Sequence, residues 1–375
     1  MLSFEPDPKI LSQLKSLQEQ VVEIYQGVQA ATPEERAYLN HCALISNVGA
    51  TTRIENAVLT DVEIEWVDTE LSRDGRTTAF DEKKDYILDK LSKDRQRSLE
   101  EVAGSRAVLS VIYHQANEMP PLSETIIRGL HHELLQFYPP AQRYAGVYKT
   151  VINKVISRNK ATGEERTVLE PTDPGVMTET AMHELVSWYN GTIREQTWPL
   201  LAAVEFTFRF LAIHPFQDGN GRMGRALFLL ILLQAGDKYL EGVVPCMAMD
   251  RHIEQNRARY YSVLHQASEG RYRPDPRDYQ YAGLVTFFLK IFAAALQDIR
   301  VYRERFRSLN ELSEASVKVL ACFKSLPERQ IKVAEIEVHT KLPRRTIQFA
   351  LKKLTGAGFL QRQGKAAGVR YRLVF

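Results

Sequence analysis

One stretch of the sequence, from His214 to Arg225, combines residue types that could hold a polyphosphate. Gly219 and Gly221 permit positive φ angles, so successive backbone N–H groups can converge on an anion at the start of a helix. Arg222 and Arg225 are three residues apart and would add forked donors from one face of that helix. The spacing therefore predicts a phosphate-binding loop followed by a helix.

Two further side chains in this stretch could carry out chemistry on a bound phosphate. Asp218 directly precedes the glycine loop, where a Mg²⁺ ion bridging phosphate oxygens would need one protein ligand. An imidazole titrates near neutrality, so His214 could take the proton of a hydroxyl that attacks the phosphate. Each residue alone is more simply explained as structural or solvated, but the ordered run favours a catalytic site.

The elements that position this stretch are mostly helices. Apolar residues recur at three- and four-residue spacing up to about residue 300, which predicts a mainly α-helical fold. Helix 199–212 would end just before the loop and helix 223–234 would begin just after it. Further helices are expected over 10–29, 84–117, 123–137, 178–195 and 284–306.

One segment interrupts the helical pattern. Residues 147–157 are rich in Val and Ile, residues 159–163 have turn chemistry, and residues 165–169 are again extended. This order predicts a β-hairpin inside the helical domain, and an irregular surface loop is the alternative.

The run from His214 to Arg225 resembles the Fic motif, HPFx[DE]GNGRxxR, with every defining position matched. Fic proteins transfer the AMP part of ATP to a Ser, Thr or Tyr hydroxyl of a target protein. The resemblance covers roughly residues 37–306 and implies that His214 is the general base and Asp218 the Mg²⁺ ligand. It implies that the nucleotide or its phosphates bind Gly219, Asn220, Gly221, Arg222, Met223, Gly224 and Arg225.

Other stretches resemble the family less strictly. Residues 144–149 and the hairpin after them resemble the Fic flap, whose strand holds the target by main-chain pairing. The family usually has Arg where this chain has Lys149. Residues 254–265 resemble the helix beside the nucleotide base, which makes Tyr260 a candidate adenine contact; the alternative is a packed helix aromatic.

Upstream, residues 51–56 resemble the Fic inhibitory motif, [ST]xxxE[GN]. In the family this glutamate reaches the second motif arginine and blocks productive seating of the γ-phosphate. An ion pair between Glu55 and Arg225 would occupy donors that ATP needs. Glu55 is therefore expected to inhibit the site, and a solvated helix glutamate is the alternative.

The net charge of +3 is the sum of a basic C-terminal part and a mildly acidic remainder. Residues 310–375 hold 13 Lys and Arg against 5 Asp and Glu, whereas the rest of the chain is mildly acidic. Predicted helices 314–326, 333–340 and 344–356, followed by extended segments 358–363 and 369–374, suggest a winged helix-turn-helix. Basic residues and Gln348 on its last helix and wing suit DNA, and a protein-docking domain is the alternative. The basic residues are Arg344, Arg345, Lys352, Lys353, Arg362, Lys365, Arg370 and Arg372.

These patterns define the expected organisation. Residues 1–110 would be a helical region with the inhibitory helix at about 41–57, residues 111–308 the Fic catalytic core, and residues 309–375 the winged helix. Three scattered cysteines, no evident signal peptide and no apolar run long enough for a bilayer lead us to expect a cytoplasmic protein without membrane contact.

The expected function is protein adenylylation of a target hydroxyl, with ATP as substrate, Mg²⁺ as cofactor and self-modification included. Two alternatives stay open at this point: a Fic enzyme that transfers another phosphate-containing group, and a nucleotide-sensing transcriptional regulator that binds DNA through the C-terminal domain. A homodimer is also compatible with the sequence.

Overall fold

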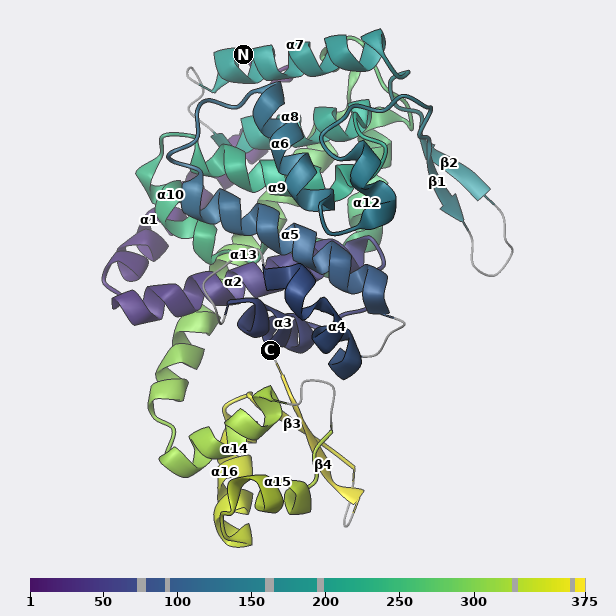
Figure 1. Cartoon of the computed structure of the whole chain (residues 1–375). Coiled ribbons are helices and arrows are strands. Elements are labelled where there is room, and N and C mark those ends of the chain that lie inside the picture. The colour runs from purple at the N-terminus through teal and green to yellow at the C-terminus, as the bar shows by residue number, and fades with distance from the viewer. Residues whose placement is uncertain are drawn as a thin grey trace. The chain divides into compact units, whose positions relative to one another are not determined.

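The computed structural model describes residues 1–72, 79–91, 95–158, 165–193, 199–325, 330–364 and 368–374. Over these residues the fold is mainly helical, as the sequence predicts, with two small antiparallel sheets of two strands each (Figure 1). Contacts divide the chain into two compact units, residues 1–57 with 97–299 and residues 58–96 with 300–375.

These units differ from the expected boundaries at residues 110 and 308. Residues 58–96 group with the C-terminal part of the chain, and an ion pair of 3.3 Å between Glu65 and Lys324 joins the two segments. The N-terminal region that the sequence suggested as one block is thus divided between the two units.

The first unit holds the elements around the predicted site. Its helices are α1 (Pro8–Gln29), α2 (Pro33–Ile54), α5 (Gln96–Gln115), α6 (Glu124–Leu135), α7 (Val176–Thr192), α8 (Pro199–Ile213), α9 (Asn220–Leu233), α10 (Lys238–Val243), α11 (Met249–Gln255), α12 (Arg257–Ser268) and most of α13 (Tyr281–Asn310). Short 3₁₀ helices lie at Pro139–Tyr144, Val244–Cys246 and Pro276–Asp278. Strands β1 (Val155–Arg158) and β2 (Glu165–Leu169) form its sheet.

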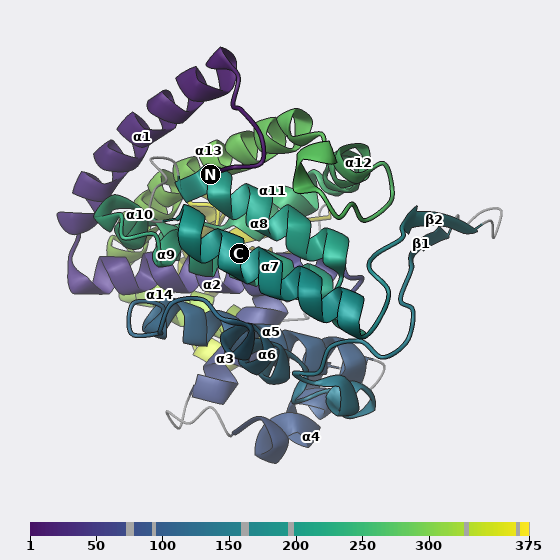
Figure 2. The same cartoon turned by 90° about the horizontal axis from the view of Figure 1, so that it is seen from above.

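Helices α8 and α9 form the centre of this unit. Nearly every residue of both is buried, which is the pattern of a helix surrounded by protein on all sides. Figure 2 shows the pair among α7, α2 and α13, and Phe228 of α9 packs on Phe288 of α13 with ring centroids 5.2 Å apart. The loop between α8 and α9 therefore joins two buried helices.

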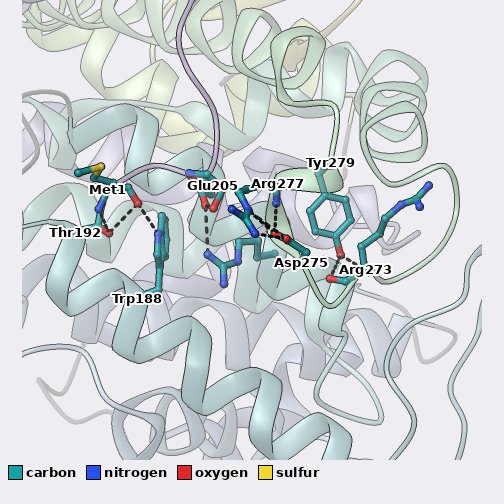
Figure 3. Close-up of polar contacts among 10 residues, drawn as sticks. Met1, Trp188, Thr192, Glu205, Arg273, Asp275, Arg277 and Tyr279 are labelled. Carbon is teal, nitrogen blue, oxygen red and sulfur yellow. Dashed lines mark hydrogen bonds and ion pairs between the residues drawn. The ribbon is translucent and has the colours of Figure 1, made fainter.

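The N-terminal segment is fastened to α7 and α8. The indole of Trp188 donates to the Met1 carbonyl at 2.8 Å, and the side chain of Thr192 also points at Met1 (Figure 3). The fully buried carboxylate of Glu205 on α8 accepts from the backbone N–H of Ser3 at 3.0 Å and from Arg209 at 3.2 Å. These contacts satisfy a buried charge on the helix that leads into the predicted catalytic loop.

Helix α13 is the longest helix that the structure describes. Of the described helices, it is the one whose length and hydropathy would allow a membrane span. However, 56% of its most apolar stretch is buried inside the structure, and core helices of soluble proteins can have the same length and hydropathy.

Two local predictions are corrected. The expected helix 84–117 is two helices, α4 (Ala79–Leu91) and α5; both bury apolar residues at helical spacing, so the periodicity continues across the break. The expected first hairpin strand is also shorter, because β1 begins at Val155. Residues before it contact the loop after α8 instead, through a bridge between Tyr148 and Phe216. The predicted turn at 159–163 lies outside the described residues.

The second unit contains α3 (Asp61–Ser72), α4, the end of α13, α14 (Glu314–Lys324), α15 (Val333–Thr340), α16 (Arg344–Gly356), β3 (Leu360–Gln363) and β4 (Arg370–Leu373). Strands β3 and β4 pair antiparallel, and Ile331 bridges Tyr371 of β4. Buried residues of α14, α15 and α16, including Phe323, Ile336 and Leu351, share one core. Three helices followed by two strands is the predicted order of elements; their identity as a winged helix-turn-helix stays a prediction, and Lys365 lies outside the described residues.

Candidate functional site

A cavity of about 290 Å³ opens beside the loop that joins α8 to α9. The loop provides one wall, α12 and Glu55 just after α2 provide others, and Val155 and Val168 of the hairpin also line it. The predicted site residues that line this cavity are Glu55, His214, Asp218, Gly219, Asn220, Gly221, Arg222, Arg225 and Tyr260. The structure thus brings together side chains from three parts of the sequence that are far apart.

His214 lies directly after the last residue of α8. Its backbone N–H still donates to Phe210 in the helical pattern, but its φ angle of 52° turns the chain away from the helix. Loss of hydration lowers the pKa of His214 to about 4, so the imidazole is neutral at pH 7. A proton on Nδ1 would satisfy the Leu211 carbonyl 3.3 Å away, which leaves the lone pair on Nε2 to accept a proton.

The side chain of Asn220 closes the loop rather than facing a ligand. Its Nδ2 donates to the Phe216 carbonyl at 2.7 Å, and its Oδ1 accepts from the Phe216 N–H at 2.9 Å. Gly219, with φ of 79°, forms the N-cap of α9 in the left-handed region. Phosphate contact by Asn220 is therefore limited to its backbone N–H, which projects from the first turn of α9.

His131 on α6 supports the loop from behind, and the sequence analysis did not identify it. Its Nδ1 accepts from the Gly146 N–H at 2.9 Å, so Nε2 carries the proton and donates to the Asp218 carbonyl at 2.9 Å. The ring stacks on Phe216 with centroids 3.7 Å apart, and burial lowers its pKa to about 4. Phe216 thus anchors the loop. The sequence marks His131 only as a histidine on the apolar face of an amphipathic helix.

Asp218 keeps 43% of its side chain exposed at the cavity. One oxygen accepts from the Gly219 N–H at 2.6 Å and lies 3.6 Å from Nη2 of Arg222. Among the described residues, no group of three or more acidic, Cys or His side chains could hold a metal ion. A lone accessible carboxylate fits a Mg²⁺ ion that takes its remaining ligands from phosphate and water.

Arg222 is a buried cation with open donors. Its side chain is 4% exposed, and neither Nε nor Nη1 has a hydrogen-bond partner among the described residues. Buried polar atoms are nearly always satisfied, so two guanidinium nitrogens without hydrogen-bond partners, on a residue that lines the cavity, point to a ligand with oxygen acceptors.

Arg225 is held by the last turn of α2. Its Nε donates to the Thr51 hydroxyl at 2.8 Å, and Nη2 donates to the Thr51 carbonyl at 3.0 Å and to Glu55 Oε1 at 2.9 Å. The predicted contact between Glu55 and Arg225 is confirmed. The Glu55 carboxylate packs against Gly221, in the space that a Cβ there would need.

Asp250, on α11, is a second carboxylate beside Arg225 that the sequence analysis missed. Its Oδ2 lies 3.9 Å from Arg225 Nε, and its backbone N–H donates to Asn47 of α2 at 2.9 Å. Burial raises the pKa of Asp250 to about 6. Nothing in its local sequence distinguished it from the surface acids nearby.

The structure shows which of three predicted nucleotide-binding residues, Met223, Gly224 and Tyr260, line the cavity. Met223 and Gly224 do not line the cavity: Met223 is fully buried, and a Cβ on Gly224 would contact Leu211 of α8. The Met223 N–H already donates to Gly219. Tyr260 does line the cavity and is almost fully buried, and burial raises the pKa of its hydroxyl.

Comparisons with known proteins address the same region. The model of the Fic/DOC family matches residues 121–232. The protein adenylyltransferase Fic of Drosophila willistoni is 33% identical over 104 residues, which are 28% of this chain and 19% of that protein. The protein of the same name from Drosophila melanogaster is 33% identical over 93 residues, or 25% of this chain and 17% of that protein. The matched region is thus less than a fifth of the length of these curated relatives.

Solved structures resemble a larger part of the chain. A Fic domain containing signaling protein from Bacteroides thetaiotaomicron superposes with a TM-score of 0.56 over 76% of this chain and 95% of its own, at 22% identity. A Fic family protein from Desulfovibrio desulfuricans gives 0.55 over 100% of this chain and 98% of its own, at 19% identity. At this identity the likeness shows a shared fold. Residues 121–232 thus match the Fic/DOC family model, and the fold around them resembles that of Fic proteins.

Proposed function

We propose that this chain is a protein adenylyltransferase that transfers AMP from ATP to a Ser, Thr or Tyr hydroxyl of a protein, and that Glu55 inhibits it. The observation that carries the proposal is the pairing, in one cavity, of a neutral histidine with a buried guanidinium, two of whose nitrogens have no hydrogen-bond partner among the described residues. Fic domain enzymes transfer nucleotide or phosphate groups, and the curated relatives are protein adenylyltransferases. The cavity supports that chemistry here.

In the proposed reaction the acceptor hydroxyl oxygen bonds to the α-phosphorus of ATP, and the bond from that phosphorus to the bridging oxygen breaks. His214 takes the hydroxyl proton, and pyrophosphate leaves. The charge of a bound polyphosphate would raise the pKa of His214 from about 4 toward the range in which a general base works best.

The remaining residues bind and orient the nucleotide. Backbone N–H groups at the start of α9 and the donors of Arg222 would hold phosphate oxygens, and Tyr260 lies where a base could pack. Asp218 would hold Mg²⁺, which supplies positive charge to offset that of the leaving pyrophosphate. Asn220 and His131 contribute by fixing the loop.

Glu55 would inhibit transfer because its carboxylate takes the place of a phosphate of ATP. Its carboxylate occupies one donor of Arg225 and the space against Gly221, at the same wall of the cavity that the phosphates need. An anionic ligand can compete for this position only if it replaces the hydrogen bond that the carboxylate makes.

The test uses the purified Glu55→Gly chain with ATP, Mg²⁺ and a cell lysate, followed by mass spectrometry for added AMP. We expect labelled protein, and we expect His214→Ala in the same background to abolish the label while ATP affinity changes little. His183→Ala, at an exposed histidine on α7, is the matched control and should label normally. Normal labelling by the His214→Ala chain would refute the mechanism, and labelling with another phosphate-containing group would show a different donor.

A second function, DNA binding by the second unit, is favoured by one face of α16. Ile347 and Leu351 bury the opposite face, while Arg345, Gln348 and Lys352 are exposed. Such a helix offers donors to phosphates and to base edges. A salt-dependent mobility shift that Arg345→Ala weakens would support this function, and the absence of any shift at low salt would exclude it.

A further inference from the structure

The turn that carries His214 is strained and is held from outside. A left-handed backbone is unfavourable for a residue with a Cβ, and His214 adopts it with φ of 52°. Such a conformation persists only where neighbouring groups determine it. The groups in question are the four successive carbonyls of residues 213–216, each of which accepts a hydrogen bond from a residue outside the turn.

Lys149 holds two of these carbonyls. Its ammonium group donates to the Ile213 carbonyl at 3.1 Å, and its backbone N–H donates to the Pro215 carbonyl at 2.8 Å. The hydroxyl of Thr172 donates to the same Ile213 carbonyl at 3.0 Å. Lys149 is 2% exposed and does not line the cavity, so its side chain serves the turn rather than a ligand.

Asn153 holds the other two. The two N–H groups of its side-chain amide donate to the His214 carbonyl at 3.2 Å and to the Phe216 carbonyl at 2.6 Å. One amide thus spans the residues on both sides of Pro215, which fixes the direction in which the chain leaves His214. Lys149 and Asn153 lie on the same short segment, between the 3₁₀ helix at Pro139–Tyr144 and β1.

We propose that Lys149 and Asn153 are positioning residues that clamp the catalytic turn and so set where His214 Nε2 lies relative to the phosphates. The clamp rests on the proposed function for its catalytic consequence, but the hydrogen bonds themselves can be tested without activity. Because neither side chain is a wall of the cavity, loss of the clamp displaces the base and leaves the nucleotide site intact.

Four variants in the Glu55→Gly background separate these roles. Asn153→Asp has the same shape but replaces both N–H donors by oxygen lone pairs that face two carbonyls. Lys149→Met removes the ammonium donor, and Lys149→Arg restores one. Lys154→Met is the matched control, because Lys154 is exposed and bonds to Glu170 on the hairpin rather than to the turn.

The test measures three quantities for each variant: the transfer rate at saturating ATP, the ATP dissociation constant, and hydrogen exchange of the peptide that contains residues 213–220. Asn153→Asp and Lys149→Met should lower the rate about 100-fold, the loss expected when a catalytic group is misplaced by about 1 Å, with little change in ATP affinity. Both should speed exchange in that peptide, while Lys149→Arg and Lys154→Met stay near the parent in every measurement.

The clamp is refuted if exchange in this peptide is unchanged in Asn153→Asp and Lys149→Met, or if their transfer rate and ATP affinity fall together. An inactive Glu55→Gly parent would overturn the proposed function alone, since the exchange measurement would still decide whether the clamp exists. Thermal unfolding of each variant identifies any chain that has lost its fold, and exchange in whichever of Asn153→Asp and Lys149→Met still folds then decides the matter.

Discussion

Glu55→Gly is the substitution whose effect follows most directly from the structure. The change removes one charge-assisted hydrogen bond, 2.9 Å long, between Glu55 and Arg225. Such bonds contribute about 1.5–3 kcal/mol, and the lower end applies here because about a third of the Glu55 side chain is exposed to water. About 1.5 kcal/mol corresponds to roughly a tenfold gain in ATP affinity for the productive position.

The structure also predicts that this gain comes without loss of the fold. Arg225 keeps its bonds to Thr51 and its neighbour Asp250, so no buried charge is left alone. Glu55 lies after the last residue of α2, where glycine is readily accommodated at a helix end. The free energy of unfolding should therefore change by less than about 1 kcal/mol.

The assay is the initial rate of self-modification with labelled ATP below saturation, together with the ATP dissociation constant. Both should improve about tenfold in Glu55→Gly; adding His214→Ala should abolish the rate but leave the gain in ATP affinity. Glu254→Gln is the control: Glu254 lies close by on α11 but bonds to Arg53 instead of Arg225. An equal gain in the control, or an unchanged rate in Glu55→Gly, would show that the ion pair does not restrain the site.

Three further predictions rest on single side chains. Arg222→Met should weaken ATP binding at least tenfold yet leave the free energy of unfolding equal or higher, because the change removes buried donors that lack partners; calorimetry and chemical denaturation measure the two effects. Asp218→Asn should raise the Mg²⁺ concentration needed for half-maximal transfer, and a Mg²⁺ titration that matches the parent would exclude Asp218 as the ligand. His131→Gln should flatten the dependence of stability on pH: the pKa of His131 is about 4 in the fold against an ordinary 6.5, so its contribution is full above pH 6.5 and is lost as the pH falls toward 4, by up to about 3 kcal/mol. Urea denaturation at pH 7 and pH 5 checks this, and a parallel decline in both chains would contradict it.

The loop between α8 and α9 could be predicted because its chemistry is local. The glycines, the two arginines, Asp218 and His214 follow one another along the chain, and the flanking helices show clear apolar periodicity. The contact of Glu55 with Arg225 came from a family resemblance, since 170 residues separate the two and no spacing rule connects them.

The residues that hold the loop in place could not be predicted from the sequence, because they reach it only through tertiary contacts. His131, Asn153 and Asp250 are common residue types in ordinary surroundings, and only the fold brings them to the site. The direction of each side chain from α9 also cannot be known from the motif: Met223 and Gly224 belong to it but do not line the cavity.

Helix α2 restricts how the proposed inhibition could be relieved. Along this helix Leu39, Ile45 and Val48 are fully buried, so detaching it would expose several core side chains at about 1.5–3 kcal/mol each. The side chain of Glu55, by contrast, lies past the helix end and can change rotamer without moving the core. The inhibition would then be relieved by a side-chain rotation on the nanosecond scale rather than by a slow domain opening. The arrival of its ligands would set how fast the site responds.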